Sequence, residues 1–269
     1  MKSTLLRVHA ITLVLMVIGI VPVVHAGSSE DSVVGVEKYG DHAIREFALR
    51  VNDELDQHKV NVAIIARSGR PRGQLPDGVS YTHVAFVVFE PVQGSDGATF
   101  HTYTVYNLYQ GGNGAADRSY LKQDLTYDFV AGVLEKDIAV CVPHDELQQR
   151  LIEVIRSPVY RQLHNTNYNL VTNPWVDRFD NCVTHTLKVI MAAIYRTDDR
   201  GRIYENIRLY FKPTPIRLGF VKSFGSNFVK GLSYADKDRS GLQTASYDSV
   251  KAFLAANGLM KAEFKMAVN

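Results

Sequence analysis

Two strand signals on either side of a short turn restrict the fold of this chain more than any other feature of its sequence. Residues 81–89 form a largely apolar run that carries His83, and residues 99–109 are rich in β-branched and aromatic side chains. Gly94-Ser95-Asp96-Gly97 lies between them and is typical of a turn. We therefore expect an antiparallel hairpin that begins a sheet covered by helices.

The remaining patterns add helices and further strands to this hairpin. Apolar residues at helical spacing indicate helices, and short β-branched runs indicate strands. The expected helices cover 41–55, 144–156, 181–195 and 247–257, and the expected strands cover 60–66, 137–142 and 259–268. Loops are expected over 67–78 and 168–179, with one or two short helices around Phe211 and Phe224. Together these elements predict an α+β fold in which helices pack on an antiparallel sheet.

The first 26 residues have the organisation of a secretory signal peptide. Lys2 and Arg7 precede an apolar stretch over 11–24, and Val24-His25-Ala26 supplies the small residues that a signal peptidase requires. An uncleaved membrane anchor is the alternative, but the stretch is short for a bilayer span and is interrupted by glycine and proline. We therefore expect a secreted protein, with the periplasm as its compartment and no membrane span after cleavage.

Cleavage after Ala26 would leave a helical N-terminal segment at 27–57 and one main domain at 58–269. The removed peptide carries two of the 30 basic residues and no acidic ones, so the remaining 28 basic residues match the 28 acidic residues. A neutral chain without a basic cluster argues against nucleic acid as the main partner.

The chain contains two cysteines, Cys141 and Cys182. Both lie in the part expected to be exported, and two cysteines in an oxidising compartment often form a disulfide. Cys141 lies in a predicted buried strand, where a cysteine usually acts as a small apolar side chain. Cys182 follows Asp180-Asn181, a pair suited to capping a helix, and therefore falls in its first turn. A reactive thiol and a disulfide with Cys141 are thus two alternative roles for Cys182.

A thiol at a helix start and a histidine on a strand are the groups needed for a cysteine nucleophile. The helix amides and dipole favour the thiolate of Cys182, and the imidazole of His83 can accept and return a proton. Both residues can instead be ordinary members of a core. His185 is a second choice of base, because a neighbour on the same helix points along it. No second pair of ligands has zinc spacing, so we expect neither a metal nor a cofactor.

The register of the hairpin limits which residues can orient His83. A turn centred on 95 and 96 pairs position 83 with a residue near 108, and it places His101 about five residues, roughly 17 Å, away. Three residues of the opposite strand can lie beside His83, namely Thr104, Tyr106 and Asn107. Asn107 is favoured as the orienting group, although a shift of one residue exchanges the two faces.

Two further residues are candidates for substrate binding. Trp175 is the only tryptophan and lies six residues before Asn181, where it can form the wall of a cleft or fill the core. Arg67 begins the loop that precedes the His83 strand, and with Arg70 it can bind an anionic group of a substrate or remain solvated.

Five segments carry a resemblance to known proteins, namely Ala63-Ile64-Ile65-Ala66-Arg67-Ser68-Gly69, Tyr81-Thr82-His83-Val84-Ala85-Phe86, Tyr168-Asn169-Leu170-Val171, Asn173-Pro174-Trp175 and Arg178-Phe179-Asp180-Asn181-Cys182. Through these segments the chain resembles an uncharacterised bacterial family, domain of unknown function 2145, over roughly residues 58–195. The histidine strand precedes the cysteine helix, and in this order the chain also resembles the circularly permuted papain-like superfamily, of the NlpC type. Lecithin–retinol acyltransferase-like proteins of that superfamily share the Asn181-Cys182 helix start.

The resemblance implies a permuted papain-like fold with Cys182 as nucleophile and His83 as base. Thr104 stands where a histidine is expected for the third catalytic position, and the family supplies a class of mechanism but no substrate. The sequence therefore predicts an exported thiol hydrolase or acyltransferase. It would act on an amide or ester bond of a cell-wall peptide or a lipid acyl group. The alternative is a non-catalytic periplasmic binding or structural module of the same fold.

Overall fold

A computed structural model of the chain describes residues 33–112, 115–217, 235 and 241–269. The predicted signal peptide at 1–26 and the predicted short helix around Phe224 lie outside these residues. In the described part, no helix combines the length and the apolar character needed to cross a membrane.

The centre of the fold is an antiparallel sheet of six strands in the order β4-β3-β2-β1-β5-β8. The hairpin predicted from the sequence is confirmed as its longest pair of strands. The strands are β1 (Val62–Arg67), β2 (His83–Gln93), β3 (Thr99–Gln110), β4 (Ser119–Leu125), β5 (Asp137–Pro143) and β8 (Met260–Ala267). A separate pair, β6 (Thr214–Ile216) and β7 (Leu242–Thr244), forms a two-stranded sheet. The predicted α+β class with an antiparallel sheet is therefore confirmed.

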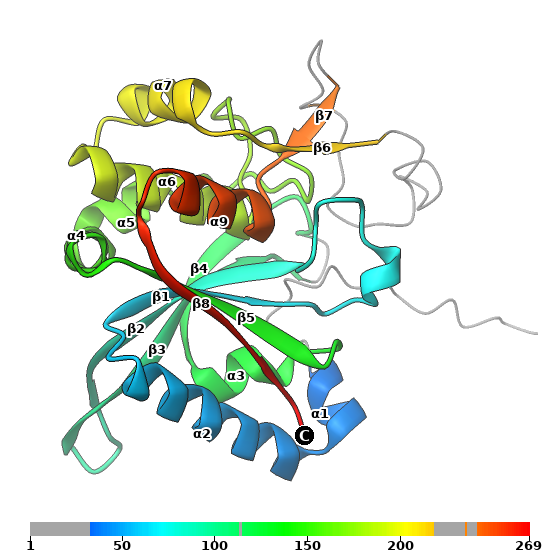
Figure 1. The fold of residues 1–269 in the computed structure, drawn as a ribbon, viewed down its shortest axis with the longest axis vertical. Helices are drawn as coiled ribbons and strands as arrows, with labels where there is room; N and C mark the ends of the chain where they lie inside the picture. The colour runs from blue at the N-terminus through cyan, green and yellow to red at the C-terminus, as the bar shows by residue number, and fades with distance from the viewer. Residues whose placement is uncertain (1–32, 113–114, 218–234, 236–240) are drawn as a thin grey trace, which may run out of the picture.

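Helices cover both faces of the six-stranded sheet, which makes it the middle of three layers (Figure 1). One face carries α1 (Val34–Tyr39), α2 (Asp41–Gln57) and α3 (Thr126–Ala131). The other face carries α4 (Asp145–Arg156), α5 (Pro158–Gln162), α6 (Cys182–Tyr195), α7 (Arg200–Tyr210) and α9 (Tyr247–Ala256). A short 3-10 helix, η1 (Arg72–Gln74), lies between β1 and β2. Because both faces are covered, every residue of β1 is buried.

The sheet separates two cores, which we call the α2-side core and the α6-side core. The α2-side core includes Ile44, Phe47, Val51, Leu55, Ala63, Ile65, Ala85, Val87 and Phe129. The α6-side core includes Val62, Ile64, Val84, Phe86, Cys182, Leu187, Ile190 and Leu254. Neighbouring residues of β1 and β2 alternate between the two cores, as the pleat of a strand requires. This alternation fixes the side of the sheet on which each functional residue lies.

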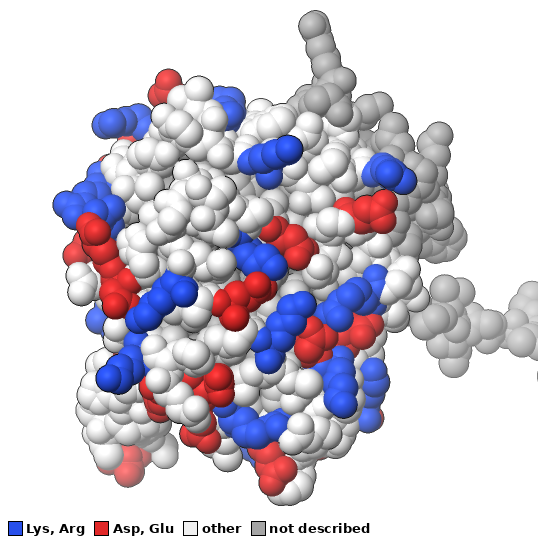
Figure 2. Space-filling model, in the orientation of Figure 1, with Lys and Arg blue, Asp and Glu red and all other residues white. Residues whose placement is uncertain are grey.

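The structure departs from the sequence prediction directly after the hairpin and after α6. β4 and α3 were not predicted, because Ser119–Leu125 carries four polar residues and no clear period. The short helix expected around Phe211 is α7, which ends at Tyr210 and leaves Phe211 buried just beyond its end. On the face shown in Figure 2, basic and acidic side chains are interspersed, which agrees with the balanced charge of the sequence.

Candidate functional site

Cys182 is the first residue of α6, and the residue before it caps the helix as predicted. The Asn181 side chain accepts a hydrogen bond from the Thr184 amide at 2.9 Å, and its Nδ2 donates to the Leu170 carbonyl oxygen. The Cys182 sulfur lies 3.9 Å from the carbonyl oxygen of Thr82. Hydrogen bonding by the backbone amides of Val84, Val183 and Cys182 itself acts on the same sulfur. The thiol is therefore held against the backbone of the residues on either side of His83.

Both cysteines are free thiols buried in the α6-side core. The Cys182 side chain is 4 % exposed, and burial raises its pKa to about 11, although the amides and the charge of Arg67 act in the opposite direction. Burial also raises the pKa of Cys141, which faces Ile64 in the ladder between β1 and β5. The structure thus lacks the disulfide that was the alternative role for Cys182, and both thiols are protonated at neutral pH.

His83 is the first residue of β2 and is completely buried. Its Nε2 lies 2.9 Å from Oδ1 of Asn107, the residue favoured by the sequence to orient it. Asn107 Nδ2 donates to the Val105 carbonyl oxygen and to Asp124, so Oδ1 is the acceptor and the proton of the neutral imidazole belongs on Nε2. No described residue hydrogen-bonds to Nδ1. This arrangement leaves a basic lone pair on Nδ1.

Burial determines the charge of His83. Loss of hydration and, to a lesser degree, the nearby positive charge of Arg67 lower the pKa of its imidazole to about 3, against the effect of the Asn107 hydrogen bond. The ring stacks on Tyr109 with centroids 5.1 Å apart and lies 5.6 Å from Phe129. His83 is therefore neutral over the whole physiological range of pH.

The hairpin register differs from the predicted register by one residue. Phe86 pairs with Tyr106 and Pro91 pairs with His101, which places His83 level with Tyr109 and not with position 108. Asn107 and Tyr109 share the face on which the imidazole lies. Two alternatives to Asn107, Thr104 and Tyr106, lie on the opposite face, and the Tyr106 hydroxyl bonds to Glu90.

The thiol and the imidazole lie on different sides of the sheet. The ring of His83 packs against Phe129, a member of the α2-side core, whereas Cys182 belongs to the α6-side core. Since His83 is the first residue of β2, its own peptide groups stand between the two functional groups. The structure thus brings Asn107 to the imidazole of His83 and brings Cys182 to the backbone of His83.

Arg67 does not lie in a loop, as the sequence predicted, but is the last residue of β1. It is 1 % exposed, and its guanidinium lies 5.2 Å from the centre of the Phe129 ring, beside His83. Its charge acts on both the Cys182 sulfur and the His83 imidazole. Arg67 is therefore a buried cation shared by the candidate pair and not a solvated loop arginine.

Gly132 makes room for this guanidinium. A Cβ atom at position 132 would lie 1.1 Å from Arg67 Nη1, and the burial of Arg67 restricts its movement. We expect Gly132→Ala to lower the free energy of unfolding by about 1–3 kcal/mol, as overpacking typically does. Urea unfolding measures the change, and Gly73→Ala is the control because a Cβ there meets no atom within 4 Å. Equal stabilities of the two variants would contradict this role for Gly132.

Trp175 packs beside α7. The Trp175 side chain is half-buried against the α6-side core, and its carbonyl oxygen accepts a hydrogen bond from Arg208 of α7 at 3.0 Å. Its amide donates to the Asn173 side chain, which closes the turn that the sequence predicted to be irregular. These contacts identify Trp175 as a packing residue between the 168–179 loop and α7, and its predicted role in substrate binding remains a prediction.

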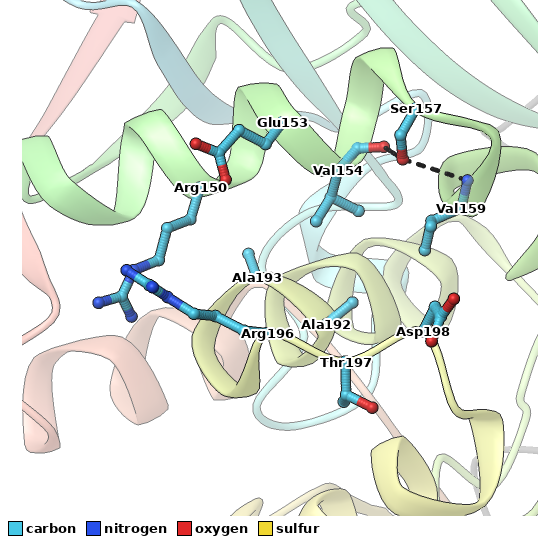
Figure 3. A pocket seen from close by; sticks show the side chains of 10 residues that line it. All are labelled: Arg150, Glu153, Val154, Ser157, Val159, Ala192, Ala193, Arg196, Thr197 and Asp198. Atoms are coloured by element: carbon cyan, nitrogen blue, oxygen red, sulfur yellow. Dashed lines mark hydrogen bonds between the residues drawn. The ribbon is translucent and has the colours of Figure 1, made fainter.

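A pocket of about 390 Å³ lies at the opposite end of α6 from Cys182 (Figure 3). It is lined by Arg150, Glu153, Val154, Ser157, Val159, Ala192, Ala193, Arg196, Thr197 and Asp198. Ten residues of helix separate Cys182 from Ala192, which corresponds to about 15 Å along the axis. This pocket is therefore not the place where a substrate would meet the thiol.

Comparison with known proteins places the candidate residues in a family. Residues 54–254 match the family described as "Uncharacterized protein conserved in bacteria (DUF2145)". The chain belongs to this family. No curated protein and no solved structure matches the chain. The match contains Arg67, His83, Asn107 and Cys182, so the whole candidate site lies within the DUF2145 region.

A buried ion pair fixes the loop that leads into Cys182 in this DUF2145 protein, and it was not predicted from the sequence. Lys188 Nζ lies 2.7 Å from Asp180 Oδ2, and both side chains are completely buried. Lys188 also donates to the Leu163 carbonyl oxygen, and the Asn165 amide donates to Asp180. Burial raises the pKa of Asp180 to about 6, although Lys188 acts to lower it. The carboxylate is therefore ionised at neutral pH. A lysine within an apolar helix was the sequence signal from which this buried ion pair could have been predicted.

His185, the second choice of base, lies beside this ion pair. Its Nδ1 lies 4.0 Å from Asp180 Oδ2, and its ring contacts those of Tyr160 and His164. Burial lowers its pKa well below the usual range. In the described parts of the DUF2145 chain, no group of three or more histidine, cysteine, aspartate or glutamate side chains is arranged to hold a metal ion.

Proposed function

We propose that this DUF2145 protein is a thiol hydrolase or acyltransferase in which Cys182 is the nucleophile and His83 is the base. The observation that carries the proposal is the hydrogen bond from His83 Nε2 to Asn107, which leaves Nδ1 as the basic atom. The backbone on both sides of that histidine holds the thiol. Because the thiol lies at the start of α6, the free amides of the first helical turn can donate hydrogen bonds to an oxyanion formed at the substrate carbonyl.

The proposed reaction proceeds through a thioester. The Cys182 sulfur attacks the carbonyl carbon of an amide or ester while His83 Nδ1 takes the thiol proton, and amides at the start of α6 bind the oxyanion. The imidazolium then gives its proton to the leaving amine or alcohol as the carbon–nitrogen or carbon–oxygen bond breaks. Water, or a second acceptor in a transferase, attacks the thioester with His83 as base, and the thiol is restored. Because the peptide groups of His83 stand between the two side chains, the first proton would pass around the start of β2 through a bridging water molecule.

The substrate class follows from export and from fold resemblance. The expected signal peptide would deliver the protein to the periplasm, where cell-wall peptides and lipid acyl groups are available. In chain order the histidine strand precedes the cysteine helix, and helices pack on an antiparallel sheet. Both features support a place in the circularly permuted papain-like superfamily. We infer a cell-wall peptide or a lipid acyl group as the substrate.

A second candidate function is a non-catalytic binding or structural module. The observation that favours it is the burial of both functional groups, since Cys182 is 4 % exposed and His83 is completely buried. In such a module the two residues would only fill the cores on either side of β2. The reactivity of Cys182 therefore distinguishes the two functions.

Alkylation of the native protein by iodoacetamide between pH 6 and 9 tests the pair. If the neutral imidazole takes the thiol proton as the sulfur attacks, the rate at Cys182 should be nearly constant over this range, because neither group changes its charge between pH 6 and 9. In His83→Gln the rate should instead follow the thiolate and rise about tenfold per pH unit. The variant should then be at least about tenfold slower at pH 6 than the unaltered protein.

Cys141 is the control for this experiment within the same molecule. It is buried, its pKa is raised, and it has no histidine in the proposed chemistry. Peptide mapping by mass spectrometry reports the two thiols separately. Labelling of Cys182 that is no faster than that of Cys141, or that is unchanged in His83→Gln, supports the non-catalytic module.

A further inference from the structure

A buried carboxylate on β4 ends the hydrogen-bond chain that starts at His83. Asp124 Oδ2 accepts a hydrogen bond from Asn107 Nδ2 at 3.0 Å and another from the Tyr109 hydroxyl at 2.8 Å. The side chain of Asp124 is 4 % exposed, and its Oδ1 lies 3.1 Å from the ammonium group of Lys122. The chain of contacts therefore runs from the imidazole through Asn107 to Asp124, and Lys122 connects it to the surface.

Asp124 determines which way the amide of Asn107 faces. An amide can turn over and exchange its oxygen and its nitrogen. If Asn107 turned over, its oxygen would face the carboxylate of Asp124 and the carbonyl oxygen of Val105, both of which are acceptors. Its nitrogen would then face His83 Nε2, which would have to give up its proton. The carboxylate thus disfavours the reversed amide more strongly than a neutral acceptor would.

The orientation of Asn107 decides which ring nitrogen of His83 is basic. With Oδ1 facing the ring, the proton stays on Nε2 and the lone pair lies on Nδ1. With the amide reversed, the lone pair would lie on Nε2, where it would be occupied by the Asn107 amide group. The neutral ring would then have no free basic nitrogen.

We infer that Asp124 is a positioning residue that holds His83 in the Nε2–H tautomer by fixing the amide of Asn107. No hydrogen bond of Asp124 reaches the thiol or Nδ1. Asp124 acts on the tautomer through Asn107, and its other partner, Tyr109, stacks on the imidazole without a hydrogen bond to a ring nitrogen. The effect of Asp124 on the reactivity of Cys182 rests on the proposed function, whereas its effect on the tautomer does not. This role was not predicted from the sequence, because β4 itself was not predicted.

Two-dimensional NMR of protein labelled with ¹⁵N in its histidine rings tests the inference, and His83→Gln assigns the resonances of His83. In the unaltered protein we expect Nε2 to carry the proton and Nδ1 to be bare. In Asp124→Ala we expect the Nδ1–H tautomer to appear and the alkylation rate of Cys182 at pH 7 to fall on the order of tenfold. Asp124→Asn keeps the shape and one acceptor oxygen, so it should change both quantities in the same direction and by less.

Asp128→Asn is the matched control, because Asp128 is a nearby carboxylate that accepts from the Leu125 amide and has no part in the chain from His83. It should leave the tautomer unchanged. A pure Nε2–H tautomer in both Asp124 variants would overturn the inference, and Asp124→Asn decides the question if Asp124→Ala does not fold. A changed tautomer together with an unreactive Cys182 in the unaltered protein would support the positioning role and refute the proposed function.

Discussion

Replacing Lys188 with methionine is expected to lower the free energy of unfolding by about 3–5 kcal/mol, because it leaves the carboxylate of Asp180 buried without its cation. The two charged groups are 2.7 Å apart and fully buried. Methionine matches the length of the lysine stem and keeps the apolar contacts within α6. The loss therefore reports the uncompensated charge and not a cavity.

Urea unfolding measures this loss, and the chain offers a control with the same geometry. Lys261 and Asp145 are also 2.7 Å apart, but their side chains are 41 % and 71 % exposed. Lys261→Met should cost less than about 1 kcal/mol, as is usual for surface ion pairs. In the double variant Lys188→Met with Asp180→Asn, no buried charge remains, so part of the stability should return. A cost for Lys188→Met as small as that for Lys261→Met would contradict the role of the buried pair.

The ion pair also stabilises the helix start that carries the Cys182 thiol. Asp180 lies two positions before Cys182, and its backbone forms hydrogen bonds with the backbone of Asn167 and Asn169 in the segment that leads into α6. Lys188 lies further along α6 and binds the same carboxylate. The ion pair therefore joins the segment before α6 to α6 itself, close to Cys182, the first residue of the helix. A loss of Lys188 should loosen the helix start as well as the whole fold.

The sequence was sufficient for those parts of the site that depend on local patterns. The turn at 94–97 with a strand on each side predicted the hairpin, and Asn181 before an apolar helix predicted the start of α6. Asn107 was favoured among the residues that can lie beside His83, but the predicted register placed it on the opposite face and was wrong by one residue. The turn is longer than assumed, and the resulting shift brings Asn107 and Tyr109 to the face of His83.

Long-range features of the site were not predicted, for physical reasons that apply to particular residues. β2 is apolar on both faces, so its sequence did not show that the His83 ring would pack in the α2-side core, away from Cys182. Arg67 follows five apolar strand residues and was assigned to the loop, because a completely buried arginine is rare. Asp124 lies in a strand with no clear period, and its partners lie 15 and 17 residues away.

The largest expected effect on activity is that of replacing Cys182 with alanine. If Cys182 forms the proposed thioester, intact-mass measurement of the unaltered protein should detect an acyl adduct, and Cys182→Ala should abolish it. Turnover of Cys182→Ala should fall on the order of 10³-fold or more, because no other group in the mechanism attacks the carbonyl carbon. The measurement uses cell-wall peptides and acyl esters as substrates. Cys141→Ala should retain its turnover, since Cys141 lies in β5 and takes no part in the reaction.

Cys182→Ser separates the loss of a nucleophile from the loss of a structural residue. Serine fits the space of the thiol and keeps a donor for the Thr82 carbonyl oxygen, so the melting temperature should stay within a few degrees of that of the unaltered protein. The hydroxyl is a much weaker nucleophile than a thiol at neutral pH, so turnover should still be lost. Turnover of Cys182→Ala equal to that of the unaltered protein would refute the mechanism. A loss of several kcal/mol of stability in Cys182→Ser would instead identify Cys182 as a structural residue of the α6-side core.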